Sequence, residues 1–188
     1  MKHLHPQFLS AHKAQLIVID IQEKLFPFMA EEYRKGMLRY VPVLLAAAKE
    51  LALPVTVTEQ YRKGLGRTIP ELRPLIEGLP NFEKVEFAST EVEQVVARLA
   101  QNNRKQVIVC GMETHICVYQ TALGLRQLGY DVHLVADAAG ARFPLNHETG
   151  LRLMDQAGCR ITTTETVLFQ LLEKAGTEAF KKLQKMII

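Results

Sequence analysis

The sequence predicts an α/β protein: a three-layer α/β/α, doubly wound fold around a six-stranded, mostly parallel sheet. Short apolar runs, typical of strands buried on both faces, alternate along the chain with longer segments of helical periodicity. The chain has 188 residues without an internal repeat or a linker, which indicates a single domain over residues 1–188. Doubly wound sheets commonly have the strand order 3-2-1-4-5-6, and we expect this order here.

Six short segments are the predicted strands: residues 82–87 show the alternation of a strand, and the others are short runs rich in apolar or β-branched residues. They lie at residues 15–20, 54–58, 82–87, 106–110, 132–136 and 160–163. We expect Gly111 to end the fourth strand. The predicted loops are residues 21–32, 59–78 and 137–146, and the second of them has room for at most one short helix near residues 70–77.

Apolar residues at helical spacing predict the helices that cover the sheet. The first predicted helix spans residues 33–51, although Pro42 lies within it. Its apolar face consists of Met37, Val41, Leu44, Leu45 and Ala48. Further helices are expected over residues 90–102, from residue 114 onward, over 147–157 and twice after the last strand. The predicted N-caps are Thr90, with Glu93 as its capping-box partner, Thr114, Thr164 and Thr177.

Composition limits the partners and the compartment. The formal net charge is +3, from 23 Lys and Arg against 20 Asp and Glu, and the basic residues are dispersed. This balance argues against nucleic acid or an anionic membrane as a partner. No apolar run reaches membrane-spanning length. Three cysteines, an odd number, and an N-terminal segment without the apolar core of a signal peptide predict a soluble, cytoplasmic protein.

Cys117 is the first candidate for chemistry, because it follows a predicted strand and lies in the first turn of a predicted helix. The free N–H groups and the dipole at a helix N-terminus favour a thiolate, and the same N–H groups can hold an oxyanion. The alternative is a small buried hydrophobe, which is the common role of a free cysteine. We assign that structural role to Cys110 and Cys159, which lie in or beside strands.

Asp20 and Lys84 are predicted to lie near Cys117. Asp20 ends the first strand and Cys117 follows the fourth, and these two strands are neighbours in the expected order. Lys84 is the only lysine within a predicted strand. A carboxylate near a thiol can accept its proton, and an ammonium group can stabilise the thiolate. The alternative roles are a turn cap for Asp20 and a solvent-exposed position at the sheet edge for Lys84, but a chance convergence of all three residues is improbable.

Three motifs resemble those of the isochorismatase-like cysteine hydrolases, a superfamily that includes nicotinamidases and N-carbamoylsarcosine amidohydrolases. They are LIVIDIQ with Asp20 and Gln22, FEKVEF with Lys84, and CGMETHICVYQTA with Cys117. The stretch TEQYRKGLG at residues 58–66 is most similar to a subgroup whose substrates are poorly defined. The resemblance implies that Cys117 is the nucleophile, Asp20 its base and Lys84 the cation that lowers its pKa.

The resemblance also implies the remaining parts of an active site. A cis peptide bond is expected between Met112 and Glu113, and it turns the Glu113 N–H toward the Cys117 N–H to form an oxyanion hole. Phe26 matches a pocket-lining position. The other expected substrate-binding residues are Gln22, Tyr61 and His115. Because His115 lies two positions before Cys117 on a helix, it is a weaker candidate base than Asp20.

Two further groups of polar residues follow the second and the fifth predicted strands. Nicotinamidases bind a metal with a carboxylate and histidines after the second strand, but this chain has Glu59, Gln60 and Tyr61 there, so we expect neither a catalytic metal nor another cofactor. Asp137, Arg142 and His147 follow the fifth strand. For these three we favour turn-stabilising roles, with Arg142 also able to bind an anionic group.

Three functional hypotheses remain open at this stage. The first is hydrolysis of a small amide-like C–N bond through a thioester. The second is isochorismatase-type cleavage of a vinyl ether, in which Asp20 donates a proton and no thiol is needed. The third is a regulatory binding protein without turnover. In each case we expect a small-molecule ligand, and the resemblance implies a homo-oligomer, a dimer or larger.

Overall fold

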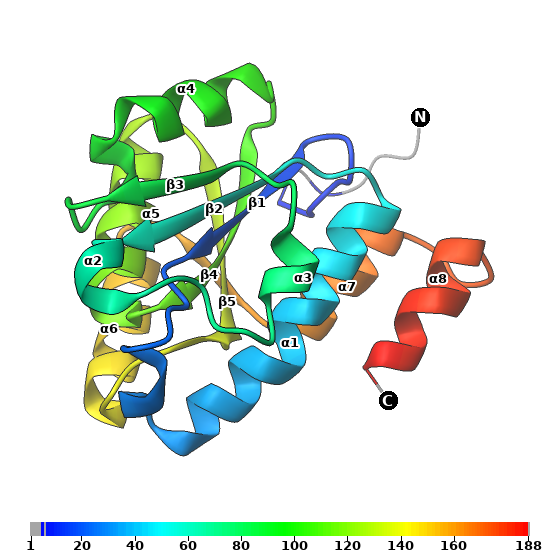
Figure 1. The fold of residues 1–188 in the computed structure, drawn as a ribbon. Helices are drawn as coiled ribbons and strands as arrows, with labels where there is room; N and C mark the ends of the chain where they lie inside the picture. Colours follow the sequence, from blue (N-terminus) through cyan, green and yellow to red (C-terminus); the bar gives the residue numbers. More distant parts are fainter. Residues whose placement is uncertain (1–4, 6, 188) are drawn as a thin grey trace.

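The computed structural model describes residues 5 and 7–187 and contains one sheet of six parallel strands (Figure 1). The strand order is β3-β2-β1-β4-β5-β6, so the predicted order and doubly wound fold are confirmed. The strands are β1 (Ala14–Ile19), β2 (Val55–Gln60), β3 (Asn81–Lys84), β4 (Gln106–Met112), β5 (Asp131–Gly140) and β6 (Arg160–Thr162). The winding direction reverses between β1 and β4, which places the carboxyl ends of these two strands beside a crevice.

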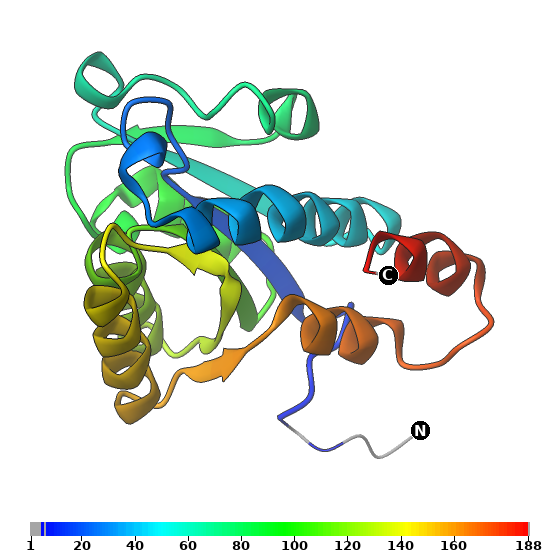
Figure 2. The same cartoon turned by 90° about the horizontal axis from the view of Figure 1, so that it is seen from below.

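Helices cover both faces of the sheet (Figure 2). One face carries α1 (Glu31–Glu50) and α7 (Thr164–Leu172), with α8 (Glu178–Leu183) packed outside them. The other carries α4 (Glu93–Gln101), α5 (Tyr119–Gln127) and α6 (Pro144–Gln156). The shorter helices are η1 (Phe26–Phe28), α2 (Arg62–Leu65), α3 (Arg73–Ile76), η2 (Ser89–Glu91), the π-helical turn η3 (Thr114–Val118) and η4 (Gln184–Met186). No helix in the described residues has the length and apolar character needed to cross a membrane.

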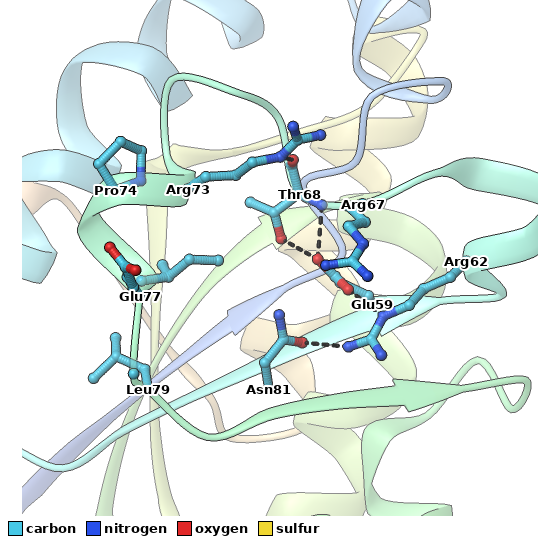
Figure 3. Close-up of a pocket in the computed structure, with 11 residues that line it drawn as sticks. Glu59, Arg62, Arg67, Thr68, Arg73, Pro74, Glu77, Leu79 and Asn81 are labelled. Carbon is cyan, nitrogen blue, oxygen red and sulfur yellow. Dashed lines mark hydrogen bonds and ion pairs between the residues drawn. The ribbon is translucent and has the colours of Figure 1, made fainter.

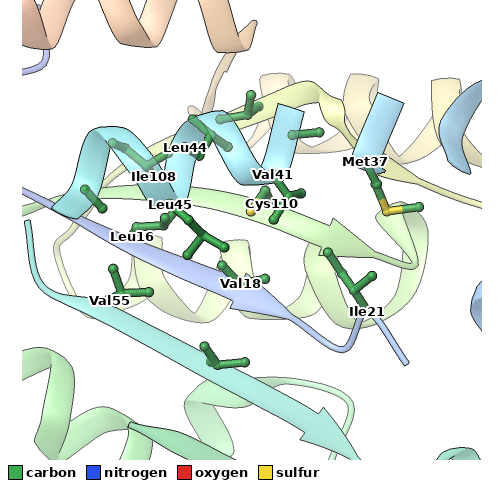
Figure 4. Packing of buried hydrophobic residues seen from close by; sticks show 14 of the residues in the cluster. Leu16, Val18, Ile21, Met37, Val41, Leu44, Leu45, Val55, Ile108 and Cys110 are labelled. Atoms are coloured by element: carbon green, nitrogen blue, oxygen red, sulfur yellow. The ribbon is translucent and has the colours of Figure 1, made fainter. Parts of the chain in front are cut away.

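The predicted apolar face of α1 packs on the sheet (Figure 4). All five of its predicted core residues are buried, and Pro42 is accommodated within the helix. Their side chains meet buried residues of β1 and β4, among them Leu16, Val18 and Ile108. Burying each large aliphatic side chain contributes roughly 1.5–3 kcal/mol before the entropy cost of ordering it, so this contact fixes α1 against the strands that carry the site.

Gly111 does not end β4, contrary to the sequence prediction. The strand continues to Met112, and Gly111 has a φ of +122° within it. A Cβ atom at this position would lie 2.1 Å from the carbonyl oxygen of Ile19 in β1. Glycine is therefore required because two backbones approach closely at the point where β1 and β4 open the crevice.

Strand β5 is also longer than predicted. Residues 137–140, which were expected in a loop, continue the strand to Gly140, after a shift in register between Val109 and Gly111 of β4.

The excursion between β2 and β3 also differs from its prediction, because it contains two short helices, α2 and α3, where at most one was expected. These differences arise because pairing and packing with distant segments outweigh the local turn signals.

Three of the four predicted helix caps are wrong. Residues 89–91 form the 3₁₀ turn η2, so α4 begins after Val92 and has no side-chain cap. Thr114 does not cap its own helix, which begins instead with the π-helical turn η3. At α7 the cap is Thr163, whose side chain accepts a hydrogen bond from the Thr166 N–H, and not Thr164. Thr177 caps α8, as predicted.

Candidate active site

Asp20 lies directly after β1 at the opening of the crevice. Its φ is +53°, a left-handed conformation that Asp adopts more readily than most residues. The Asp20 N–H donates to the Thr58 carbonyl oxygen at 3.0 Å, and the Thr58 hydroxyl donates to Asp20 Oδ1 at 2.7 Å. The carboxylate is therefore fixed by the end of β2, and its side chain is completely buried.

Lys84 is the last residue of β3 and reaches across β2 to Asp20. Its Nζ lies 2.6 Å from Asp20 Oδ2, and both side chains have an exposed fraction of 0 %. The ammonium donates to Gln60 Oε1 at 2.6 Å and to the carbonyl oxygens of Glu86 and Phe87 at 3.1 and 3.2 Å. The ammonium therefore has four oxygen neighbours, and the Asp20 Oδ2 carboxylate oxygen is one of the two closest.

Cys117 lies in the turn η3 and points into the same cluster. Its exposed fraction is 7 %, and its Sγ lies 4.0 Å from Gln60 Oε1. The sulfur is close enough to Asp20 and Lys84 to interact with both charges. The fold thus brings together three residues that are distant in the sequence, since Asp20 and Cys117 are 97 positions apart.

The electrostatics of the cluster correct one expectation. Burial raises the pKa of Cys117 to about 12, the Asp20 carboxylate adds to the rise, and the Lys84 ammonium only partly lowers it. Burial also raises the pKa of Asp20, against the lowering effects of Lys84 and Thr58. The net shift favours the Cys117 thiol over the thiolate that the sequence suggested, because a dry site disfavours a second anion beside Asp20.

The turn that carries Cys117 is held by Glu113 and its partners. The peptide bond between Met112 and Glu113 is cis. The Glu113 carbonyl oxygen accepts from the N–H groups of Ile116 and Val118, while its buried carboxylate accepts from the N–H and Nε of Arg142 at 3.0 and 3.2 Å. Arg142 is thereby engaged within the protein by its backbone and guanidinium.

Helix α6 packs against the other side of the same turn. His147 Nδ1 lies 2.9 Å from the Thr114 hydroxyl, and its ring stacks on Tyr33 with a centroid distance of 4.2 Å. A Cβ at Gly150 would lie only 3.0 Å from the Cα of His115, so α6 and the turn are in close contact there. Asp137 joins β5 to α7, since its Oδ1 accepts from the N–H and hydroxyl of Thr164 at 2.9 Å. Asp137 and His147 therefore make structural contacts between elements around the crevice.

The family model described as the isochorismatase domain matches residues 14–166, which contain all of these side chains. The chain belongs to the isochorismatase domain family. It is 39% identical over 188 residues to isochorismatase domain-containing protein 2 of Xenopus laevis, a match that covers 96% of this chain and 86% of the relative. It is 37% identical over 191 residues to the secreted isochorismatase effector Isc1 of Phytophthora sojae, covering 95% of this chain and 86% of the relative.

A solved structure described as MAR1 ribonuclease from Caenorhabditis elegans is also similar. It superposes with a TM-score of 0.89 at 33% sequence identity, covering 96% of this chain and 92% of that one. The isochorismatase family membership supports a hydrolase fold. Because one family relative is described as secreted, the cytoplasmic location expected for this chain stays a prediction.

Gln22 is not available for substrate, contrary to the sequence prediction. Its side-chain Nε2 donates to the carbonyl oxygens of Gln60 and Gly66 at 2.8 and 2.7 Å, and its Oε1 accepts from the Gln60 N–H at 2.7 Å. Both N–H groups of its side-chain amide, and its side-chain oxygen, are thus bonded to backbone groups. Its role is to join the end of β2 to the excursion that follows.

Three further predicted substrate contacts lie around the crevice, and their roles stay predictions. Phe26 is partly buried against the core in η1. Tyr61 follows β2 in a left-handed conformation with φ +38°, and its side chain is 48% exposed. His115 is partly exposed, its Nδ1 has no hydrogen-bond partner in the described chain, and burial lowers its pKa.

Glu59 is the carboxylate at the position where nicotinamidases bind metal. Its Oε1 accepts from the N–H and hydroxyl of Thr68 at 2.7 and 2.6 Å, and its Oε2 pairs with Arg62 (Figure 3). Both oxygens are therefore engaged by the protein. No group of three His, Cys, Asp or Glu suited to a metal occurs among residues 5 and 7–187, and whether the protein uses a metal stays a prediction.

Sequence reasoning missed Gln60 and Thr58 as neighbours of Asp20, Lys84 and Cys117. Gln60 bridges Lys84 and Cys117 through Oε1, and Thr58 holds Asp20. A signal was present, because residues 55–60 alternate Val, Thr, Val, Thr, Glu, Gln, which indicates polar side chains on one face of a strand. That face lies toward Cys117 once β2 is placed beside β1.

Proposed function

We propose that this protein is a cysteine hydrolase that cleaves a small amide-like C–N bond through a thioester. The observation that carries the proposal is the buried cluster of Asp20, Lys84 and Cys117 at the sheet's switch point. The Asp20 carboxylate, which is buried beside the Cys117 thiol, is suited to take the thiol proton. Lys84 keeps the carboxylate charged between transfers.

The raised pKa values of Asp20 and Cys117 support a concerted first step. As the Cys117 sulfur bonds to the carbonyl carbon, its proton moves to Asp20, so the dry site never holds a separate thiolate beside the carboxylate. The N–H groups of Glu113 and Cys117 hold the oxyanion. Asp20 then passes the proton to the leaving nitrogen as the C–N bond breaks. Water attacks the thioester, gives its proton to Asp20, and the thiol is restored as the acid departs.

The test is a panel of small amides and ureides assayed with wild type, Cys117→Ala and Cys159→Ala. We expect Cys117→Ala to lose on the order of 10⁴- to 10⁶-fold in turnover, because the nucleophile is removed. Cys159 is also buried and lies outside the cluster, so Cys159→Ala controls for the loss of a buried thiol. Mass spectrometry should show an acyl adduct on Cys117, and substantial turnover by Cys117→Ala would exclude the covalent route.

Acid cleavage of a vinyl ether is the second candidate, and the raised pKa of Asp20 favours it because a protonated carboxyl can donate. Isochorismate belongs in the same panel for this reason. If Asp20→Asn abolishes its cleavage while Cys117→Ala and thiol alkylation leave it intact, the second mechanism replaces the first. Absence of turnover with every substrate would favour the third hypothesis, a regulatory binding protein.

RNA hydrolysis is a further candidate, because the similar solved structure from Caenorhabditis elegans is described as a ribonuclease. The dispersed charge of +3 provides little attraction for a polyanion. Incubating RNA with wild type and with Asp20→Asn distinguishes this activity from contamination. Cleavage that persists in the variant does not arise from this cluster.

We also propose that the protein forms a homo-oligomer. Phe28, Phe143 and Leu145 expose 69, 61 and 72% of their surface. They lie on neighbouring segments, since the Ala30 N–H donates to the Ala141 carbonyl oxygen at 3.1 Å. A second copy covering this patch would remove it from water. Light scattering on wild type and Leu145→Glu should show a smaller particle for the variant.

A further inference from the structure

A cavity lies on the opposite face of β2 from Cys117. It has a volume of about 590 Å³, within the usual range for small-ligand sites, and lies between the excursion after β2 and the edge of the sheet (Figure 3). Successive residues of a strand point to opposite faces, so Gln60 faces the catalytic cluster while Glu59 faces this cavity. The two sites are therefore separated by the thickness of the sheet.

Three arginines line the cavity, and one of them has an unused guanidinium. Arg62 pairs with Glu59 and donates to Asn81 Oδ1, and Arg73 pairs with Glu23 and donates to the Thr68 carbonyl. Arg67 uses its backbone N–H on Glu23, but its guanidinium has no acceptor among the described residues. In Figure 3 this guanidinium lies beside Glu59 and Arg62 at one end of the cavity.

The rest of the lining is suited to the body of a small molecule. Pro74, Ile76 and Leu79 supply apolar surface. Asn81 holds the arginine end in place, because its Oδ1 accepts from Arg62 and its side chain also hydrogen-bonds Glu59. At the other end, the Glu77 carboxylate makes no ion pair with any described residue, and it repels a second negative charge (Figure 3).

We propose that this cavity binds a small organic anion with one carboxylate or phosphate head and an apolar body, at a site distinct from Cys117. The head meets Arg67, whose planar guanidinium can donate two parallel hydrogen bonds to a carboxylate or phosphate. The apolar body lies against Pro74, Ile76 and Leu79. An anion charged at both ends is disfavoured by Glu77.

Calorimetric titration tests the site with benzoate and phenyl phosphate as probes and benzyl alcohol as their neutral counterpart. We expect at least one anion to bind and benzyl alcohol not to. Arg67→Gln should weaken binding about tenfold or more, because a charged hydrogen-bonding partner is lost. Lys63→Gln removes the same charge from a neighbouring residue outside the cavity lining, and it should change affinity less than about twofold.

Two further arms separate the proposed site from the catalytic one. Cys117→Ala and wild type labelled at Cys117 with iodoacetamide should both bind the anion as wild type does, whatever reaction Cys117 performs. Terephthalate, with a carboxylate at each end, should bind more weakly than benzoate and should gain affinity in Glu77→Gln. The proposal is overturned if neither anion binds, if Arg67→Gln binds as wild type does, or if labelling Cys117 removes binding.

Discussion

Asp20 and Glu59 are buried carboxylates at the ends of adjacent strands, yet their surroundings shift their pKa values in opposite directions. Burial raises the pKa of Asp20, and Lys84 and Thr58 do not reverse the rise. Burial also opposes the ionisation of Glu59, but hydrogen bonds from Thr68 and Arg62 outweigh it and lower the pKa. Glu59 has two donors on Oε1 and one on Oε2, whereas Asp20 has the Thr58 hydroxyl on Oδ1 and the Lys84 ammonium on Oδ2.

The difference shows how the same side-chain type serves two purposes. A carboxylate with every lone pair directed at a donor is fixed in its charged form and ties segments together. Glu59 does this for the excursion that lines the arginine cavity. A carboxylate in a dry site, where burial raises its pKa in spite of its donors, is poised to exchange a proton, which is what the proposed base requires.

Removing Lys84 should have the largest effect on stability. Lys84→Met leaves the Asp20 charge buried without its counter-ion, and we expect a loss of about 3–5 kcal/mol in the free energy of unfolding at pH 7, measured with urea. Lys35→Met breaks an exposed pair with Glu31 and should cause no measurable loss. Similar losses for the two variants would mean that burial is not what distinguishes the Asp20 pair.

Thr58→Val should have the next largest effect. It removes the hydroxyl that donates to Asp20 Oδ1, so we expect a loss of about 1–3 kcal/mol in unfolding free energy. It should also raise the pKa of Asp20 further, visible as a shift in the pH dependence of turnover.

Thr56→Val is the matched control for Thr58→Val. Thr56 is buried on the same face of β2, but its hydroxyl has no partner among the described residues. Valine there should be neutral or stabilising, because no hydrogen bond is lost. Equal destabilisation by the two substitutions would show that the Thr58 hydroxyl does not hold Asp20.

The two carboxylates should give stability opposite dependences on pH. The folded pKa of Glu59 is below its unfolded value of 4.5, so its contribution is present above pH 4.5 and is lost as pH falls through the folded pKa. The folded pKa of Asp20 is above 3.8, so ionising it lowers stability as pH rises from 3.8. Unfolding curves from pH 3 to 7 should lose acid sensitivity in Glu59→Gln and gain it in Asp20→Asn; the reverse assignment would contradict the comparison.

Arg73→Gln should have the smallest effect. Arg73 pairs with Glu23 where both side chains are partly exposed, 43 and 39%. Water already solvates these charges, so the thermal unfolding midpoint should change little. A loss as large as that of Thr58→Val would show that the cavity arginines stabilise the fold as the buried pair does.

The parts of the fold predicted correctly are those with a local or a topological signal. Apolar runs identified all six strands, and the common winding rule placed Asp20 beside Cys117. The predicted caps at Thr90 and Thr114 failed because tertiary contacts decide where a helix begins. Thr114, for example, bonds to His147, 33 positions away.

The site residues show the same limit. Gln22 was assigned to substrate from its motif, but its amide is used by the backbone of β2 and by Gly66. Gln60 was considered only for metal, although it bridges Lys84 and Cys117. The alternation of residues 55–60 places Gln60 on a polar face, but the partners of Gln22 and Gln60 are not visible along the chain, because they lie more than twenty residues away.

By itself, the sequence determined the order of strands and helices and the chemical groups available at the crevice, since periodicity and side-chain type are local properties. The tertiary structure decided which of those groups form ion pairs, which are buried away from water and which remain free for a ligand. Those properties depend on burial and on the count of hydrogen-bond donors around each charge, and both arise only when distant segments pack together. Asp20 with its raised pKa and Glu59 with its lowered one are the outcome.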